Sequence, residues 1–494
     1  MKQIVKKITI LCMALVLCLS TLNLQVAYAN EEPINQPVNQ PEQPSMWALE
    51  DVQMLSIYDI IDLSMFSDYN AFITNRELYT VGIRLYEKIT GENVTDEDIS
   101  IDDMALIKAS YKVFNVFLQQ SDLNLITTRK NVVDVLYGVI KKSAPTFEYN
   151  YDYIVDYEDI TPSDNVDSVK YLVSNRLLNG VSDERLELNN SCTKEQLFAL
   201  ASRTYYYVIQ KLDKAAKGLF WKVEGEKSTV YLLGSIHIAD SSIYPMNDDI
   251  LNAYDSSDAL SVEVDIFGSA EGLAYMQEKM VYQDGTTIDQ VLSKETYKLY
   301  VDKMESLGIK KEQYDVLKPW SAAFFIQNSE AAESSIQAGL GVDVFLMSKA
   351  LNTKPIIEIE GYKFQTDLFN SFNDEIQEAF LLSSLISPEN NTDSNSDVEV
   401  LDNVAVITNM LAAWKSGDIK GIEKYIVFDE NNVDEFNKKF LVERNEHMYE
   451  NVLNYLNDDE GKTYFVVVGA AHMITNSGIV KKLKDKGYEV EQIR

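Results

Sequence analysis

The sequence of 494 residues predicts an all-α region followed by an α/β domain with a central, mostly parallel sheet. Helical periodicity dominates residues 46–212, where short polar motifs precede apolar helices. From residue 218 to the end, apolar strands alternate with amphipathic helices, which is typical of a largely parallel sheet. Hydrophobic residues make up 46% of the chain and charged residues 24%, so both regions can form folded cores.

Residues 1–29 have the features of a secretory signal peptide. Lysines form a basic start, an apolar run follows from Ile8 to Leu19, and Ala27-Tyr28-Ala29 is a cleavage motif of small residues. The apolar run is too short to span a bilayer comfortably, so we expect a secreted, extracellular protein whose mature chain has no membrane span. An uncleaved signal anchor is the alternative. Cleavage would leave Cys192 as the last cysteine, and we therefore expect no intramolecular disulfide.

The charge of the chain limits its partners. A formal net charge of −33 excludes the broad basic face with which proteins bind nucleic acid regardless of sequence, so we expect no nucleic-acid partner. Two low-complexity segments separate the folded parts. Residues 30–45 are polar and rich in proline, which favours an extended spacer, and residues 387–399 are typical of a surface loop.

Three related motifs divide residues 46–212. Each contains a threonine just before an apolar helix, where the hydroxyl can cap the first turn, and the motifs are Ile73–Glu77, Ile126–Lys130 and Cys192–Gln196. The pattern resembles three degenerate S-layer homology (SLH) repeats, the modules that hold exported proteins to Gram-positive cell walls. The third copy matches best, with the segments Asp159-Ile160, Val169–Leu172, Leu178–Val181 and Cys192–Gln196 in the family's order.

The SLH resemblance implies a ligand for this region. In the family, an arginine of the Thr-Arg-Glu motif grips a negatively charged wall-sugar substituent, as a guanidinium can. We read the equivalent positions here as Asn75, Thr128 and Lys194. The resemblance implies a cell-wall-associated protein that binds secondary cell-wall polysaccharide through residues 46–212. A helical spacer or a protein-docking domain is the alternative.

Two strands of the α/β region each end in a Gly-x-x-His motif. The motifs end at His237 and His472, and the chain has only three histidines. Functional groups of parallel sheets lie just beyond the carboxyl ends of the strands, so we expect the two imidazoles to meet there. Glu263 ends a third strand, and two imidazoles with a carboxylate form a donor set suited to a divalent metal. A scaffold in which the histidines only hydrogen-bond between strands is the alternative.

Residues 218–494 resemble the TraB/GumN family, which includes bacterial pheromone-shutdown proteins and the animal Tiki Wnt-processing metalloproteases. The matching segments follow the family's order: Leu219–Val223, Tyr231–His237, Tyr244-Pro245, Ser257–Leu260, Val262–Asp265, Gly341–Asp343, Glu358–Glu360, Trp414–Asp418, Glu443–Asn445 and Val467–His472. In the Tiki-like branch, the paired Gly-x-x-His motifs and an acidic residue are implicated in metal-dependent peptide cleavage.

The resemblance implies a set of site residues. The catalytic residues would be His237, Glu263, His472 and Arg444, with Arg444, Asn445 and Gln365 contacting substrate. Glu360 ends a strand as Glu263 does, and the expected ligands of manganese, cobalt or zinc are therefore His237, Glu263, His472 and Glu360.

Arg444 has two open interpretations. Its guanidinium can clamp a substrate carboxylate or stabilise an oxyanion, or it can form an internal salt bridge. Asp343 follows Gly341 at a helix start and is interpreted as an N-cap, and His447 as a residue of a helix face.

Together these features lead us to expect a hydrolase, a metal-dependent peptidase that acts on extracellular peptides or proteins. A non-catalytic protein of the cell surface that binds or sequesters a peptide signal is the alternative. Catalysis requires that a bond is broken, whereas the binding protein would use the same pocket and need no metal.

Overall fold

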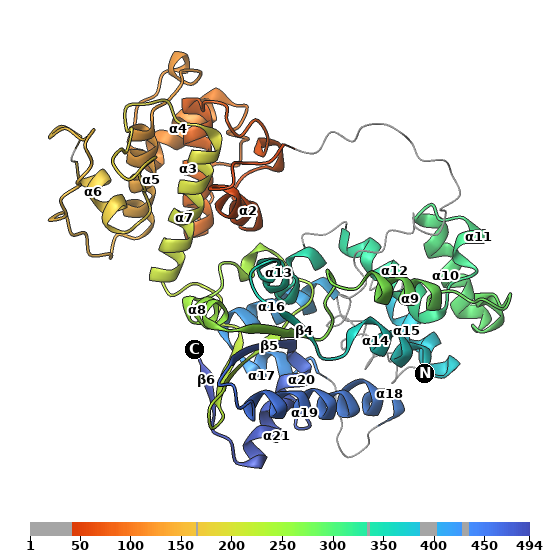
Figure 1. Cartoon of the computed structure of the whole chain (residues 1–494). Coiled ribbons are helices and arrows are strands. Elements are labelled where there is room, and N and C mark those ends of the chain that lie inside the picture. Colours follow the sequence, from red (N-terminus) through yellow and green to blue (C-terminus); the bar gives the residue numbers. More distant parts are fainter. Residues whose placement is uncertain (1–41, 165, 333–335, 386–402, 427–433) are drawn as a thin grey trace. The chain divides into compact units, whose positions relative to one another are not determined.

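The computed structural model describes residues 42–164, 166–332, 336–385, 403–426 and 434–494. The predicted signal peptide 1–29, most of the predicted spacer 30–45 and the predicted loop 387–399 lie outside the described residues. The chain divides into two compact units, one ending at Ala215 and the other beginning at Ala216 (Figure 1). None of the helices in the described ranges has the length and apolar character needed to cross a membrane.

The N-terminal unit is helical, as predicted. Its helices are α2 (Leu49–Ile57), α3 (Asn75–Thr90), α4 (Asp103–Phe114), α5 (Arg129–Ser143), α6 (Asp167–Ser174) and α7 (Lys194–Lys211), with 3-10 turns η3 (Leu63–Met65) and η4 (Gln120–Asp122). Threonines at positions 74, 128 and 193 cap α3, α5 and α7, each accepting a hydrogen bond from the third backbone amide of its helix. The capping role expected of the three motifs is therefore confirmed.

The residues just before the three caps form a closed ring of backbone hydrogen bonds. The amide of Ile73 donates to the carbonyl of Cys192, that of Cys192 to Thr127, and that of Thr127 to Ile73. Each of these residues thus occupies the same place relative to its own capping threonine. The ring also shows that the sequence-based register of the second motif is wrong by one residue, because Thr128 is the cap. Arg129 is therefore the first helical residue, equivalent to Asn75 and Lys194.

A six-stranded sheet forms the centre of the C-terminal unit, in the order β4-β3-β5-β2-β1-β6 (Figure 1). The strands are β1 (Leu219–Glu224), β2 (Thr229–Ser235), β3 (Ala259–Val262), β4 (Ile356–Glu358), β5 (Thr463–Gly469) and β6 (Val490–Ile493). Strands β2, β5, β3 and β4 are parallel, and β1 is antiparallel to β2 and β6. The prediction of a mostly parallel α/β sheet is confirmed, while β1 is a strand that the periodicity did not predict.

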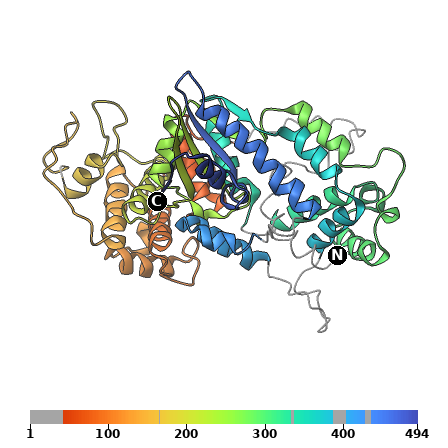
Figure 2. The same ribbon diagram turned by 90° about the horizontal axis from the view of Figure 1, so that it is seen from below.

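Some helices of this unit lie against the sheet, and others form a separate group to one side of it (Figure 2). Those early in the unit are α8 (Asp248–Ser256), α9 (Ala270–Lys279), α10 (Lys294–Ser306), α11 (Lys311–Tyr314), α12 (Pro319–Ala332) and α13 (Val342–Ala350). The later ones are α14 (Gly361–Asn370), α15 (Asp374–Leu385), α16 (Asn403–Ser416), α17 (Ile419–Glu423), α18 (Glu435–Asn437), α19 (Arg444–Leu456), α20 (Ala470–Ile474) and α21 (Ile479–Lys486). Short 3-10 turns are η5 (Ser241–Ile243), η6 (Ile288–Gln290) and η7 (Ala338–Leu340), and η8 (Lys438–Glu443) is a π-helical segment.

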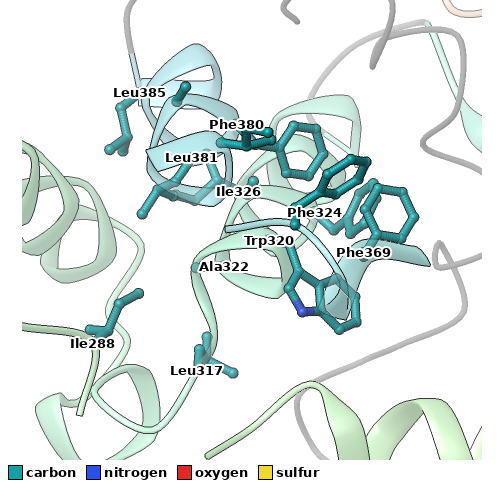
Figure 3. Close-up of a cluster of buried hydrophobic side chains, with 14 of the residues drawn as sticks. Ile288, Leu317, Trp320, Ala322, Phe324, Ile326, Phe369, Phe380, Leu381 and Leu385 are labelled. Atoms are coloured by element: carbon teal, nitrogen blue, oxygen red, sulfur yellow. The ribbon is translucent and has the colours of Figure 1, made fainter. Parts of the chain in front are cut away.

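An aromatic core fixes the helices beside the sheet (Figure 3). Trp320 of α12 stacks on Phe369 of α14 with ring centroids 5.6 Å apart, and Phe324 meets both Phe369 and Phe380 of α15 edge-on. Aromatic packing of this kind adds to the free energy of burial and holds helices at a fixed spacing. Phe440 of the π-helical segment joins the same core immediately before α19. The core thus anchors α14 and α19, which carry Gln365 and Arg444 to the sheet edge.

Candidate functional site

Three adjacent parallel strands bring the predicted residues together. His237 follows β2, Glu263 directly follows β3, and His472 lies in α20, which begins where β5 ends. All three side chains are buried. A side-chain carbon built on Gly469 would lie 3.4 Å from both His237 Nε2 and Glu263 Oε1, and 3.6 Å from His472 Cδ2. We call this volume the Gly469 space, since the missing side chain leaves it for these three groups to share.

His237 is oriented by a carboxylate distant in sequence. Its Nδ1 lies 2.9 Å from Oδ2 of Asp343 in the first turn of α13, and its Nε2 lies 4.0 Å from Oε1 of Glu263. Because a carboxylate accepts, Nδ1 carries the proton and Nε2 keeps its lone pair when the ring is neutral. The interpretation of Asp343 as an N-cap is wrong, since Gly341 holds the cap position and Asp343 turns its side chain to the imidazole.

His472 is oriented in the same way by an amide. Its Nδ1 lies 2.6 Å from Oδ1 of Asn445, whose Nδ2 donates to the hydroxyls of Thr475 and Ser477. Those two hydroxyls fix the amide so that its oxygen faces the ring, and Nδ1 of His472 therefore donates. The Nε2 atom of His472 is buried and has no hydrogen-bond partner among the described residues. Asn445, predicted to contact substrate, thus also holds the second histidine.

Arg444 lies between two carboxylates. Its Nη2 is 2.6 Å from Glu263 Oε2, and its Nε and Nη2 are each 2.8 Å from an oxygen of Glu360. Gln365 Nε2 donates to Glu263 and Glu360 at 3.2 and 3.0 Å, and the amide of Gly469 donates to Glu263 Oε1 at 2.7 Å. This is the internal ion pair left open above. Nη1 of Arg444 is buried and has no hydrogen-bond partner within the described part of the chain, so one end of the guanidinium stays available.

The surrounding groups shift the pKa values of the two histidines in opposite directions. Burial lowers the pKa of His237, but Asp343 outweighs that effect and its pKa lies above the usual value. Burial, reinforced by the charge of Arg444, lowers the pKa of His472 to about 3. Burial would raise the pKa of Glu263, yet Arg444 and the two imidazoles lower it to about 2. At neutral pH, Glu263 is therefore an anion and His472 a neutral ring. Neighbouring titratable groups whose pKa values are shifted in opposite directions are typical of acid–base sites.

The donor atoms partly suit a metal ion. A metal-ligating histidine usually donates its other ring N–H to a carboxylate or amide oxygen. Nδ1 of His237 and Nδ1 of His472 both have such a partner. Glu263 Oε1 borders the same space. Glu360 does not add an open donor, since both of its oxygens accept from Arg444. As arranged, no group of three or more His, Cys, Asp or Glu side chains in the described ranges could hold a metal ion.

Comparison with known proteins places this unit in a family. The model of the TraB/PrgY/gumN family matches residues 219–492, more than half of the chain. The chain belongs to the TraB/PrgY/gumN family. The resemblance drawn from the motifs of the C-terminal half is therefore confirmed, and the matched residues include every strand from β1 to β5 and both Gly-x-x-His motifs.

Curated relatives of this TraB/PrgY/gumN protein carry no assigned function. It is 22% identical over 174 residues to an uncharacterized protein of Treponema pallidum (strain Nichols), covering 34% of this chain and 51% of that protein. It is 26% identical over 136 residues to the uncharacterized protein YbaP of Escherichia coli (strain K12), covering 27% of this chain and 49% of YbaP. The chain thus spans about half the length of these relatives. No solved structure matches it.

Two site features of this family member could not be found from periodicity. Asp343 and Glu360 reach their partners His237 and Arg444 across more than 80 residues, and the local sequence gives no sign of either pairing. His447 also differs from its interpretation as a plain helix-face residue. Its Nε2 bonds to the carbonyl of Ile359, the residue before Glu360, at 2.9 Å, and its ring stacks on Phe364. The histidine thereby braces the end of β4.

Proposed function

We propose that the C-terminal unit is a hydrolase that cleaves peptides outside the cell. The observation that carries the proposal is the pair of buried imidazoles at the Gly469 space. A neighbour holds Nδ1 of each ring, Nε2 of His472 has no hydrogen-bond partner among the described residues, and Nε2 of His237 lies 4.0 Å from Oε1 of Glu263. Buried polar atoms with a purely structural role nearly always have hydrogen-bond partners. Imidazole nitrogens arranged in this way beside an ionised carboxylate are better suited to proton transfer.

Each side chain has a role in this proposal. His237, oriented by Asp343, takes a proton from the attacking group and returns it to the leaving amine. Arg444 offers its free Nη1 to the oxygen that becomes negative, while Glu263 and Glu360 hold the guanidinium in place. His472 offers its Nε2 as a second nitrogen. Because the ring is neutral, it does not repel a bound cation and needs no counterion.

A divalent cation (manganese, cobalt or zinc) remains a proposed cofactor. Nε2 of His237, Nε2 of His472 and Oε1 of Glu263 are the atoms that would hold it. A cation on Nε2 of His237 would take the place of the proton transfer described above, and when bound it would polarise a carbonyl oxygen. Metal content of the full chain after loading and desalting, compared with a His237→Ala/His472→Ala variant, tests this part. Near-stoichiometric metal lost in the variant supports the site, and equal retention in both proteins contradicts it.

The hydrolase itself is tested with a peptide library. Wild-type protein should cleave members of the library. The His237→Gln variant should lower turnover by about 10²-fold or more and still show a cooperative melting transition, as a folded protein does. His447→Gln serves as the matched control, because this histidine contacts a backbone carbonyl and not the Gly469 space. Peptides that bind the wild-type protein with no bond broken would favour the alternative, a peptide-sequestering protein of the cell surface.

A second candidate function concerns the N-terminal unit, for which we propose binding of an anionic wall polysaccharide. A cavity of about 530 Å³ is lined by residues of the second and third repeats together with Trp47. Arg129 lies in its wall, is 5% exposed, and bonds only to the carbonyls of Leu186 and Asn179, with no ion pair to a described residue. The same wall contains Glu195, whose carboxylate accepts from Ser45, and Arg203, which pairs with Asp51. A buried guanidinium that pairs with neither carboxylate favours an anionic ligand.

Purified cell-wall sacculi test this second function. The full chain should sediment with sacculi, and Arg129→Gln should abolish the sedimentation. Arg76→Gln is the control, because Arg76 is the second residue of α3 and already pairs with Asp103. Equal sedimentation of wild type and both variants would contradict the assignment of the cavity.

A further inference from the structure

Trp47 is the exposed member of the four tryptophans in this chain. It is 53% exposed, whereas Trp221, Trp320 and Trp414 are at most 1% exposed. Tryptophan is enriched where proteins recognise ligands and partners, because its large apolar ring also carries a polar N–H. Trp47 lines the cavity that contains Arg129. Its exposed surface therefore forms part of a cavity that already holds a buried cation.

Two ties to α7 fix the backbone around Trp47. The carboxylate of Glu195 accepts hydrogen bonds from the amide and the hydroxyl of Ser45, at 2.9 and 3.0 Å. Asp51 of α2 accepts from Nε and Nη2 of Arg203, at 2.9 and 2.6 Å. These bonds lie on either side of Trp47 in the chain. The indole is thus held in advance of binding, which lowers the entropy that a ligand must lose to order it.

Arg129 is the charged group of the lining that these ties leave for a ligand. Its Nε and Nη2 donate to the backbone carbonyls of Leu186 and Asn179, and Nη1 makes no hydrogen bond within the described residues. The cavity of about 530 Å³ has the size of a small-ligand pocket. One cation beside one exposed aromatic ring suits a sugar with an anionic substituent, because the apolar face of the sugar packs on the indole while the guanidinium pairs with the anion.

The equivalent positions of the other two repeats are occupied by neighbouring groups. Asn75 begins α3 and Lys194 begins α7, as Arg129 begins α5. Nδ2 of Asn75 donates to the carbonyl of Asp122 at 2.9 Å, and Nζ of Lys194 lies 3.7 Å from Oε1 of Glu77. Neither side chain is left for a ligand in the way that Arg129 is. We therefore expect one sugar site for the three repeats.

We propose that Trp47 and Arg129 form a single sugar-binding site, in which the indole packs on one sugar ring and the guanidinium pairs with the anionic substituent of that sugar. This inference rests on the proposed binding of wall polysaccharide and adds the residue that recognises the ring. The substituent is a carboxylate or a phosphate, the anions that a guanidinium binds. One site per chain also means that attachment gains nothing from several sites binding at once.

Acrylamide quenching of tryptophan fluorescence in the full chain tests the proposal, since Trp47 is the accessible indole. The probe is the polysaccharide released from purified Gram-positive sacculi by mild acid, cut to short fragments. Saturating fragments should protect Trp47, so that the quenching of wild-type protein falls to that of Trp47→Phe, in which the three buried indoles remain. This measurement on wild-type protein does not depend on how well a variant folds.

Calorimetric titration with the same fragments measures the affinity and the stoichiometry. We expect one bound fragment per chain. Trp47→Ala should bind about 10-fold more weakly or worse, and Trp47→Phe should recover most of that loss, since an aromatic face is restored. Met46→Ala is the matched control, because Met46 is the neighbouring residue, is 85% exposed and does not line the cavity. It should bind as wild type does.

Two chemical treatments of the fragments identify the anion. Carbodiimide and borohydride reduce carboxylates to alcohols, whereas hydrofluoric acid removes phosphates, and one of the two treatments should abolish binding. Binding that survives both treatments together overturns the proposal. Trp47→Ala that binds as tightly as wild type, or Trp47 that stays equally quenched at saturation, also overturns it and leaves wall binding by the N-terminal unit standing. Wild-type protein that neither sediments with sacculi nor binds the fragments overturns both.

Discussion

Replacing Gly469 with alanine separates the space at the site from the stability of the fold. The backbone of Gly469 has φ −51° and ψ 141°, which alanine adopts without strain, and the amide that donates to Glu263 stays in place. The added carbon would lie 3.4 Å from both His237 Nε2 and Glu263 Oε1, an ordinary contact distance, so it fits but fills the Gly469 space.

The expected magnitudes follow from this geometry. Because alanine lowers the conformational entropy of the unfolded chain, Gly469→Ala should leave the free energy of unfolding unchanged or raise it by about 0.4–1 kcal/mol. Peptide turnover should fall by about 10²-fold or more, since the reacting group can no longer occupy the space between the imidazoles and Glu263.

Urea unfolding and cleavage of a library peptide measure the two effects on the same preparation. Gly487→Ala is the matched control, because Gly487 ends α21 with φ 99° and has open space around it. That variant should lose stability and keep its activity per folded molecule. Turnover by Gly469→Ala within a factor of about two of wild type would refute the reasoning, since the space would then have no part in the reaction.

Three further perturbations test the site and the repeats. Arg444→Leu leaves Glu263 and Glu360 buried without a cation and should lower the free energy of unfolding by about 3–5 kcal/mol in urea titrations, a loss that Glu263→Gln/Glu360→Gln in the same chain should partly reverse. The pKa of His472 is about 3 in the folded protein against an ordinary value of 6.5, so the unfolded chain binds the extra proton and stability falls as pH drops from 6.5 to 3. Relative to His472→Gln, wild type should show a slope steeper by about 1.4 kcal/mol per pH unit in that window; equal slopes would argue against a neutral buried ring. Thr193→Ala removes the cap of α7 and should cost about 1 kcal/mol, and an unchanged melting curve would mean that solvent replaces the cap.

Local sequence patterns predicted much of the fold and the central residues of the site. The strands that end at Ser235, Val262 and Gly469 follow from short apolar runs bounded by glycine or a polar residue. Because these three strands are parallel and adjacent, residues at their carboxyl ends meet at one edge of the sheet, as expected for His237 and His472.

The register of the second repeat shows where local patterns fail. Two consecutive threonines, Thr127 and Thr128, can each cap a helix, and the sequence does not distinguish them. The ring of backbone hydrogen bonds through Ile73 and Cys192 decides between them, because it needs Thr127 in the loop and Thr128 at the cap. The position of Arg129, and therefore the lining of the cavity in the N-terminal unit, depends on these long-range hydrogen bonds.

By itself, the sequence determined the alternation of strands and helices, the threonine caps and the placement of histidines at strand ends, all of which depend on neighbours a few residues away. Tertiary structure decided which carboxylate orients His237 and which two carboxylates hold Arg444. The physical reason is the range of the interactions. Capping and periodicity act within one or two turns, whereas a buried charge selects its partner by packing and desolvation after distant segments have come together.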